Sequence, residues 1–296
     1  MVTLFTIPKP FEGHAAVIQR NALASWARLR PRCEVLVFGD EAGTADAVQE
    51  CGLQHIPQVA RNEQGTPLIN DAFAQAAERA RHEILVYANA DIILLDDLVQ
   101  AVERVRNLPR FLLCGRRWNL ELREPLRFDG DWVGRLRLAV AREGVLAIPG
   151  AIDYFAFPRR MFGFIPAFAV GRVEWDQWML FRARALGAAL VDATSSVLAI
   201  HQNHDYRHLA RAPRAAVQRE VDRNRELALF HRLDLRDATH VLTPTRLQPA
   251  RDLVHLRRRL FSLPKFYLPA SPGLRALYGF WRRRVRGLPG SHAADP

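Results

Sequence analysis

Residues 84–97 read I-L-V-Y-A-N-A-D-I-I-L-L-D-D. An apolar, strand-like run ends at Asn89-Ala90-Asp91, and a second apolar run, 92–95, follows at once. A lone ionised carboxylate in a buried segment costs several kcal/mol unless it is paired or binds a cation. We therefore expect Asp91 to lie at the end of a strand, next to groups that compensate its charge.

The residues before this stretch alternate between two kinds of pattern. Short β-branched and aromatic runs predict strands, and longer segments with apolar residues at helical spacing predict helices. The predicted strands are 2–7, 34–39, 53–56 and 84–88, and the predicted helices are 14–29, 44–51 and 68–80. Strands that alternate with helices indicate a parallel sheet in an α/β fold.

The pattern after residue 97 is more mixed. Strands are predicted at 111–114, 154–158, 188–191 and 197–200, and helices at 174–186 and 211–231. Residues 129–143 are either a helix or an irregular substrate loop. Prolines accumulate after Val241 and the pattern weakens. We therefore predict a folded domain over 1–245 and a basic C-terminal tail over 246–296.

Composition and cysteine usage bound the class of protein. The 296 residues are 49% hydrophobic and 25% charged, which is ordinary for a folded domain. Three widely spaced cysteines predict neither a disulfide framework nor a zinc site, and they favour a reducing compartment. The first residues lack the pattern of a signal peptide, and no run of about 18 apolar residues occurs. We expect a cytoplasmic protein.

The net charge of +11 is concentrated near the C-terminus. Ten basic and two acidic residues between 251 and 296 account for +8, which leaves +3 for the first 250 residues. Within this tail, residues 274–286 read L-R-A-L-Y-G-F-W-R-R-R-V-R. They are either a solubilising terminus or an interfacial anchor for anionic headgroups at the inner face of the plasma membrane.

Polar groups follow three predicted strands. They are Thr6-Ile7-Pro8-Lys9, Gly39-Asp40-Glu41 and Asn89-Ala90-Asp91. Ligands of open parallel sheets bind at the carboxyl ends of the strands. Asn89 and Asp91 alternate along the strand end and should share one side, where they could address a ribose hydroxyl and a divalent cation. Alternatively, Asp91 caps a helix that begins near Leu95, and Asp40 is an ordinary turn residue.

Two further clusters carry candidate chemistry. Glu174-Trp175-Asp176-Gln177-Trp178 opens a predicted helix, so its acids either stabilise the helix dipole or include a general base. Three histidines, 201, 204 and 208, lie within eight residues after an apolar strand. Histidine is a frequent metal ligand, but the H-E-x-x-H pattern of zinc enzymes is absent. No Walker A or G-x-G-x-x-G motif occurs either.

In order and spacing, these motifs resemble the GT-A class of nucleotide-sugar glycosyltransferases, in particular a group of bacterial family-2-like members. The matching segments are T-I-P-K-P-F at 6–11, V-F-G-D-E at 37–41, N-E-Q-G-T-P-L at 62–68, Y-A-N-A-D-I at 87–92, D-Y-F-A-F-P at 153–158, W-D-Q-W at 175–178 and H-Q-N-H-D-Y at 201–206. The resemblance covers roughly the first 210 residues and excludes the tail.

The resemblance implies a GT-A (Rossmann-like), mostly parallel sheet flanked by helices, with a basic C-terminal extension. It also implies Mn²⁺ or Mg²⁺ and a nucleotide-diphosphate sugar as donor substrate. The implied donor-binding residues are Thr6, Pro8, Lys9, Asp40, Asn62, Thr66, Asn89, Asp153 and Tyr154, of which Thr6, Pro8 and Asp40 serve the base and ribose and Asp153 and Tyr154 the sugar. Asn89 stands where the family's DxD motif has its first Asp.

The same resemblance assigns Asp91 and His201 to the metal and leaves open whether His204 or His208 joins them. Asp176, or with less support Glu174, is the implied general base. The predicted function is metal-dependent transfer of a sugar to a hydroxyl of a glycan or lipid-linked acceptor, with inversion, for cell-surface glycan assembly.

Two other functions compete with this prediction. A sugar-1-phosphate nucleotidyltransferase would normally begin with a Gly-rich signature loop, of which T-I-P-K-P-F-E-G-H is a poor version. A nucleic-acid-binding protein is suggested by a pI of about 10.6. The concentration of charge in the tail argues against it, so no nucleic acid is expected as a partner.

Overall fold

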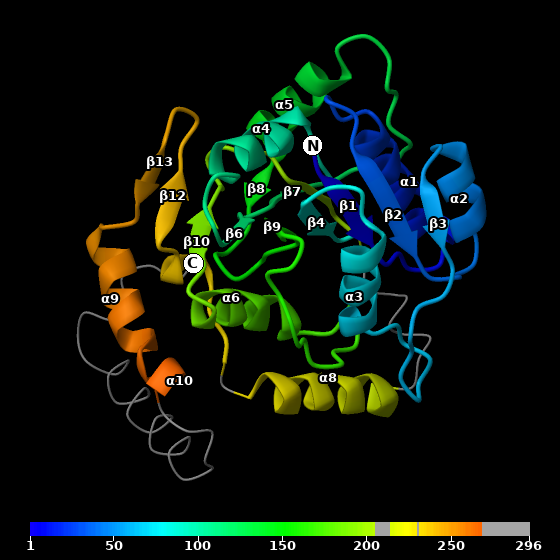
Figure 1. Cartoon of the computed structure of the whole chain (residues 1–296). Coiled ribbons are helices and arrows are strands. Elements are labelled where there is room, and N and C mark those ends of the chain that lie inside the picture. Colours follow the sequence, from blue (N-terminus) through cyan, green and yellow to red (C-terminus); the bar gives the residue numbers. More distant parts are fainter. Residues whose placement is uncertain (205–213, 230, 268–296) are drawn as a thin grey trace.

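The computed structural model describes residues 1–204, 214–229 and 231–267. Its main feature is a nine-stranded sheet in the order β13-β12-β10-β6-β9-β4-β1-β2-β3 (Figure 1). The strands are β1 (Thr3–Thr6), β2 (Glu34–Phe38), β3 (Gln54–Ile56), β4 (Ile84–Ala88), β6 (Phe111–Cys114), β9 (Tyr154–Pro158), β10 (Ala189–Asp192), β12 (His240–Leu242) and β13 (Leu247–Pro249).

Most neighbouring strands of this sheet run parallel. β3, β2, β1 and β4 form one parallel block, and β6, β10 and β12 form another. β9 lies between the two blocks and pairs antiparallel with β4 and β6. β13 closes one edge antiparallel to β12. The predicted α/β class with a mostly parallel sheet flanked by helices is confirmed.

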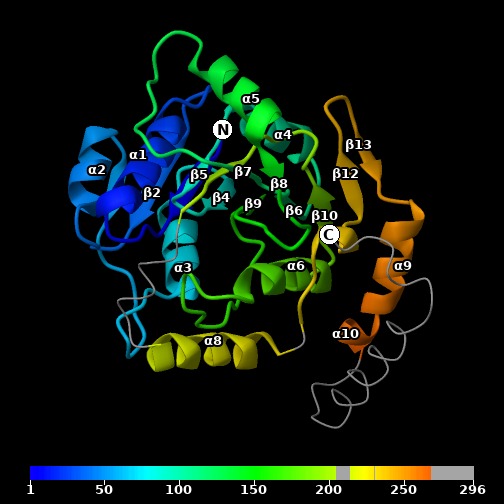
Figure 2. The same ribbon diagram turned by 180° about the vertical axis from the view of Figure 1, so that it is seen from behind.

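Helices cover both faces of the sheet (Figures 1 and 2). α1 (Gly13–Ala27), α2 (Thr44–Glu50) and α4 (Asp96–Val105) share one apolar core, which is centred on Trp26. α3 (Ile69–Arg79), α6 (Trp175–Ala185) and α8 (Arg214–Ala228) pack on the other face. This second core is aromatic: the Tyr87 ring lies 5.5 Å from Phe73 and 5.1 Å from Trp175.

A smaller sheet explains the second apolar run of the 84–97 stretch. β5 (Ile92–Ile93), β11 (Ile200–Gln202), β7 (Trp118–Leu120) and β8 (Val145–Leu146) pair in the order β5-β11-β7-β8. α5 (Trp132–Glu143) packs against this sheet, so of the two predictions for 129–143 the helix is confirmed. The strand predicted at 197–200 coincides with β11 only at Ile200.

The part after residue 228 continues the fold. The 3₁₀ turn η1 (Leu235–Asp237) contacts α9 (Leu253–Ser262), and α10 (Pro264–Tyr267) follows. β12 and β13 lie on either side of the predicted boundary at 245/246 and pair with each other. Residues 274–286 and His208, singled out in the sequence, lie outside the described residues. Among the described helices, none has the length and apolar character needed to cross a bilayer.

Candidate active site

The carboxyl ends of β1, β2 and β4 converge on one cavity of about 340 Å³. Four backbone segments, 7–10, 64–67, 89–91 and 170–172, form part of its wall. The remaining wall consists of side chains from separate elements, namely Gln19, Glu41, Arg61, Arg117, Asp153, His201 and His204. Parallel strands that end at one sheet edge bring these distant segments together.

Asp91 reaches the cavity through a turn. β4 ends at Ala88, and the backbone N–H of Ile92 donates to the carbonyl of Asn89 at 3.1 Å. Asn89 and Asp91 both line the cavity, as expected, although the cause is this turn and not alternation along a continued strand. Asp91 is only 7% exposed. Its carboxylate therefore needs the compensation that the sequence led us to expect.

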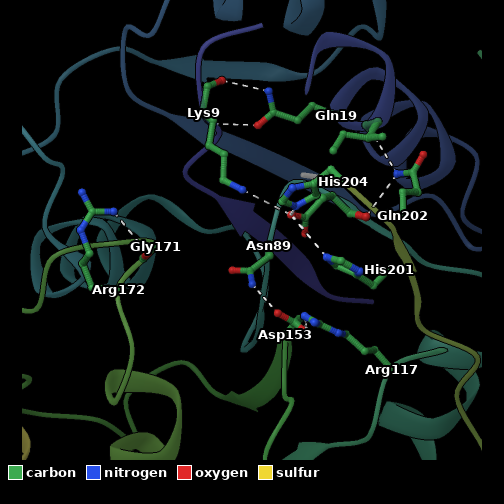
Figure 3. A network of polar contacts seen from close by, with 12 residues as sticks. Lys9, Gln19, Asn89, Arg117, Asp153, Gly171, Arg172, His201, Gln202 and His204 are labelled. Atoms are coloured by element: carbon green, nitrogen blue, oxygen red, sulfur yellow. Dashed lines mark hydrogen bonds and ion pairs between the residues drawn. The ribbon is translucent and has the colours of Figure 1, made fainter. Parts of the chain in front are cut away.

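Three cationic or hydrogen-bonding groups surround that carboxylate (Figure 3). Asp91 Oδ2 lies 3.1 Å from Nε2 of His204, 3.7 Å from Nζ of Lys9 and 4.0 Å from Nε2 of His201. Burial alone would raise the pKa of Asp91, but the His204 hydrogen bond and the charge of Lys9 hold it below its usual range. The acid is therefore ionised at neutral pH.

The pairing of β5 with β11 explains why the histidines meet Asp91. His201 lies opposite Ile92, the residue that follows Asp91 in the chain. Gln202 also holds the backbone of Asp91 in place, because its backbone N–H and its side-chain Nε2 both donate to the Asp91 carbonyl, at 3.3 and 3.1 Å. Asn21, from α1, donates in turn to Gln202 Oε1 at 2.9 Å. A two-residue strand thus positions groups more than 100 residues apart.

The residues Asp91, His201 and His204 fit a divalent cation. One ligand atom from each lies within 4.8 Å of those of the other two. Asp91 Oδ1 and His201 Nδ1 are buried and have no hydrogen-bond partner among the described residues, as expected of atoms that bind a ligand. Burial also lowers the pKa of His201, which keeps its imidazole neutral and able to coordinate. Two imidazoles favour a transition-metal ion over Mg²⁺.

A polar chain runs from this cluster along the cavity wall. Asn89 Nδ2 donates to Asp153 Oδ1 at 2.6 Å, and Asn89 Oδ1 accepts from the Tyr87 hydroxyl at 3.0 Å. Arg117 Nη1 donates to Asp153 Oδ2 at 2.6 Å. The Asn89 amide is therefore already bound on both sides, and Asp153 with Arg117 presents a fixed ion pair to the cavity (Figure 3).

The two acids at the start of α6 have different environments. Glu174 is buried, and both of its carboxylate oxygens lie 2.7 Å from Nη1 of Arg232. Burial raises the pKa of Asp176 to about 7, and the negative charge of Asp153 adds to the effect. Glu174 is thus held in an ion pair, whereas the pKa of Asp176 lies near neutral pH. Neither acid is among the described residues that line the cavity.

Four predicted donor-binding residues are placed away from the cavity wall. Thr6 and Tyr154 are fully buried, each with a hydroxyl that lacks a partner. Asp40 is exposed and paired with Arg61, so that the next residue, Glu41, lines the cavity instead. Asn62 donates to Glu220 Oε1 at 2.6 Å and accepts from backbone N–H groups of its own loop.

Pro8, Lys9 and Thr66 do line the cavity, together with residues that the sequence did not single out. Arg117 and Arg172 belong to irregular segments without a motif, in a chain already rich in arginine. Their position follows from tertiary structure alone. His204 had a usable signal, because three histidines fall within eight residues at a strand end.

No model of a protein family and no curated protein matches this sequence. Among solved structures, S. aureus TarS (residues 1–349) is 12% identical with a TM-score of 0.41, and the match covers 69% of this chain and 58% of that chain. The match thus spans little more than half of that 1–349 chain.

Two further structures are similar. For glucosyl-3-phosphoglycerate synthase from Mycobacterium tuberculosis, in complex with Mn²⁺, UDP and phosphoglyceric acid, the identity is 15% and the TM-score 0.46, over 77% of this chain and 78% of that one. For mannosyltransferase PcManGT from Pyrobaculum calidifontis, in complex with GDP-Man and Mn²⁺, the identity is 16% and the TM-score 0.43, over 96% of this chain and 82% of that one.

Proposed function

We propose that the protein is a metal-dependent glycosyltransferase that moves a sugar from a nucleotide-diphosphate sugar to a hydroxyl acceptor. One observation carries the proposal: Asp91, His201 and His204 form a cation-binding cluster on the wall of a cavity at the carboxyl edge of a parallel sheet. The same wall holds Lys9, Arg117 and Arg172, whose positive charges suit a diphosphate. An open α/β sheet binds nucleotides at this edge.

The cation-binding residues would be Asp91, His201 and His204. A bound Mn²⁺ or Mg²⁺ supplies positive charge that stabilises the leaving nucleoside diphosphate. Lys9 adds a cation of the protein's own, since its Nζ lies 3.7 Å from Asp91 Oδ2. Arg117 holds Asp153 in place, and this rigid pair is available to hydroxyls of the donor sugar.

Asp176 is the proposed general base. Its carboxylate takes the proton of the acceptor hydroxyl as that oxygen attacks the anomeric carbon. The bond between this carbon and the phosphate oxygen breaks, and its electron pair leaves with the nucleoside diphosphate. Attack from the face opposite the leaving group gives inversion. The raised pKa of Asp176, about 7, supports this role. A carboxylate with this pKa is partly deprotonated near neutral pH and is basic enough to accept the proton of the hydroxyl.

The acceptor class remains part of the proposal. A lipid-linked or surface-glycan acceptor would agree with the basic region after residue 250. The cytoplasmic location and the association of residues 274–286 with the inner face of the plasma membrane stay predictions from the sequence, as does the catalytic-domain boundary at residue 245.

A thermal-shift screen tests the proposed function. The chain is melted with UDP, GDP, CDP and dTDP and with their sugars, each in Mn²⁺ or in EDTA. We expect one nucleoside diphosphate and its sugars to raise the melting temperature only when the metal is present. Stabilisation by oligonucleotides alone would favour nucleic-acid binding. Release of pyrophosphate from a nucleoside triphosphate and a sugar-1-phosphate would favour a nucleotidyltransferase.

A further inference from the structure

Helix α9 has the reverse of the usual distribution of side chains. A helix on the surface of a globular protein normally turns its apolar face to the core and its charges to water. In α9 the residues at spacings of three and four, Leu253, Leu256 and Leu260, are 84%, 46% and 65% exposed, and Leu263 at its C-cap is 44% exposed. Ser262 is the buried residue of the helix.

Two arginines of α9, Arg258 and Arg259, face the protein and are bound there. Arg258 donates to Asp237 Oδ2 at 3.1 Å and to Asp234 Oδ2 at 2.8 Å. Arg259 donates to the carbonyls of Ala238 and Ala250 at 3.1 and 2.7 Å. These contacts fix the rotation of the helix about its axis. The leucines therefore point outward because Arg258 and Arg259 are held inward. The α9 ribbon lies at the outer edge of the described part of the chain in both views (Figures 1 and 2).

The size of the leucine face argues against a protein partner. The helix has 10 residues. Such a helix is about 15 Å long and about 10 Å wide, so one face covers on the order of 150 Å². A stable protein interface buries roughly 800 Å² on each partner. A membrane surface has no such lower limit, because the binding energy grows with each apolar side chain that enters it.

The charges beside the leucine face match an anionic surface. Arg251 precedes the helix, and Arg257 lies on its exposed side above the ring of Phe261. The exposed acid nearby, Asp252, is occupied as the N-cap and bonds to His255. Leucines flanked by arginines are typical of a helix that lies in the headgroup region of an anionic bilayer.

A half-buried cation lies next to the same face. Leu263 borders a cavity of about 340 Å³ that is also lined by Arg184 and Arg259. The guanidinium of Arg184 forms no hydrogen bond or ion pair with any described residue, and its acid neighbour Asp237 is already bound by Arg258 and Ser262. A guanidinium in this state is stabilised by an anion. A lipid phosphate at the edge of the leucine face would supply one.

We infer that α9 is a membrane-docking helix: Leu253, Leu256, Leu260 and Leu263 enter the headgroup region of an anionic bilayer, and the arginines beside them bind its phosphates. The inference concerns a different element from residues 274–286 and does not depend on any transfer activity. Docking by α9 would hold the chain at the surface where a lipid-linked acceptor is found.

Vesicle sedimentation with the full chain tests this inference. Vesicles of phosphatidylglycerol mixed with phosphatidylcholine should bind the chain, and vesicles of phosphatidylcholine alone should bind it at least about tenfold more weakly. The double variant Leu256→Glu/Leu260→Glu should lose at least about tenfold in binding to the anionic vesicles. The matched control is Leu138→Glu, since Leu138 on α5 is 67% exposed. It should bind like the unchanged chain.

Three results would overturn the inference. They are the absence of binding by the unchanged chain, undiminished binding by the double variant, and equal loss in the Leu138→Glu control. Light scattering distinguishes a second copy as the occupant: a dimer that the double variant dissociates, without vesicle binding, would assign the leucine face to self-association. Circular dichroism of each variant shows that the fold is retained.

Discussion

At the scale of single residues, the unusual group is the carboxylate of Asp91. It is buried between two apolar runs, and without neighbours its ionised form would be unstable. His204, Lys9 and His201 make the charged form the stable one, and within the described part of the chain the second oxygen, Oδ1, has no hydrogen-bond partner. A group that is ionised, buried and only half bound is prepared to coordinate a cation.

Substitution of Asp91 tests that role. Asp91→Asn keeps the shape of the side chain but removes the charge, so we expect Mn²⁺-dependent donor affinity to fall by about 100-fold or more. Isothermal titration with the preferred nucleoside diphosphate, with and without Mn²⁺, measures the effect. Asp40→Asn is the control, because Asp40 is exposed and paired with Arg61. Unchanged metal-dependent affinity in Asp91→Asn would contradict the assignment.

Asp176 should act through its protonation state. We expect kcat to fall about tenfold for each pH unit below about 7, because only the deprotonated carboxylate accepts the acceptor's proton. Asp176→Asn should lower kcat by about 10² to 10⁴ and leave donor affinity largely intact. Steady-state kinetics from pH 5 to 9 with separate donor titrations check this. An equal loss of donor affinity would count against Asp176 as the base.

The Asp176 carboxyl should also make the stability of the fold depend on pH. Stability should fall over the pH range in which kcat rises. Its folded pKa of about 7 exceeds the usual value of 3.8, so the folded state binds more protons between these two values. Its contribution to stability is present below about pH 4 and is lost as the pH rises to about 7. The free energy of unfolding of Asp176→Asn, minus that of the unchanged chain, should therefore be larger at pH 8 than at pH 4. Urea unfolding at both values would reveal a contrary sign.

At the scale of elements, the sequence predicted the parallel half well and the small sheet poorly. Strands such as 84–88 and 111–114 are fully apolar runs beside clear helices, and both were predicted to the residue. β5, β7 and β8 have two or three residues each, too few for any periodicity to show. Their pairing depends on tertiary contacts, such as Ile92 with His201.

The candidate site likewise contains residues that a sequence pattern indicates and residues that no sequence pattern indicates. The resemblance assigns Asp91 and His201 to the metal, and each residue follows an apolar run that is visible in the sequence. The resemblance assigns Tyr154 to the donor sugar. Its side chain is fully buried in the apolar core that also contains Trp26. Arg117 and Arg172 carry no local pattern, so only the folded chain brings them to the cavity.

Helix α8 is expected to hold two loops of the cavity in place. Glu220 is 4% exposed, accepts from Asn62, and binds Arg172 through Nε and Nη2 at 2.9 and 2.6 Å. Glu220→Gln should cost about 2 kcal/mol of stability and raise the donor KM severalfold. Glu226→Gln, in an exposed pair with Arg223, should change stability by less than about 0.5 kcal/mol. Urea unfolding and donor kinetics compare them, and equal effects would refute the role of Glu220.

At the scale of the whole molecule, ion pairs attach α9 to the segment 234–237, and this segment is joined to the domain by Leu233, Leu235 and Ala238 in the apolar core. Arg258 joins α9 to Asp234 and Asp237, and Ser262 donates to Asp237 as well. Part of the positive charge of α9 is therefore paired with carboxylates of the protein itself. The net charge of the chain is larger than the positive charge that a membrane or another molecule can contact.

Arg258→Ala should release α9 from the body. It removes the ion pair of the buried Asp237 and leaves Asp234 with Arg236 alone, so we expect a loss of about 2 kcal/mol in the free energy of unfolding. Faster amide exchange in α9 should accompany it. Arg257→Ala changes the neighbouring arginine, which lies over an exposed ring, and should cost less than about 0.5 kcal/mol. A similar cost for both variants would show that the buried pairs do not hold the helix.

The central claim is that Asp91, His201 and His204 together hold one divalent cation. Pulsed electron paramagnetic resonance of Mn²⁺, bound in the presence of the preferred nucleoside diphosphate, tests it directly because the spectrum detects ligating imidazole nitrogens. We predict nitrogen couplings that weaken in both His201→Ala and His204→Ala, and no bound Mn²⁺ in Asp91→Asn. Bound Mn²⁺ with couplings that neither histidine variant alters, or with oxygen ligands alone, would contradict the account.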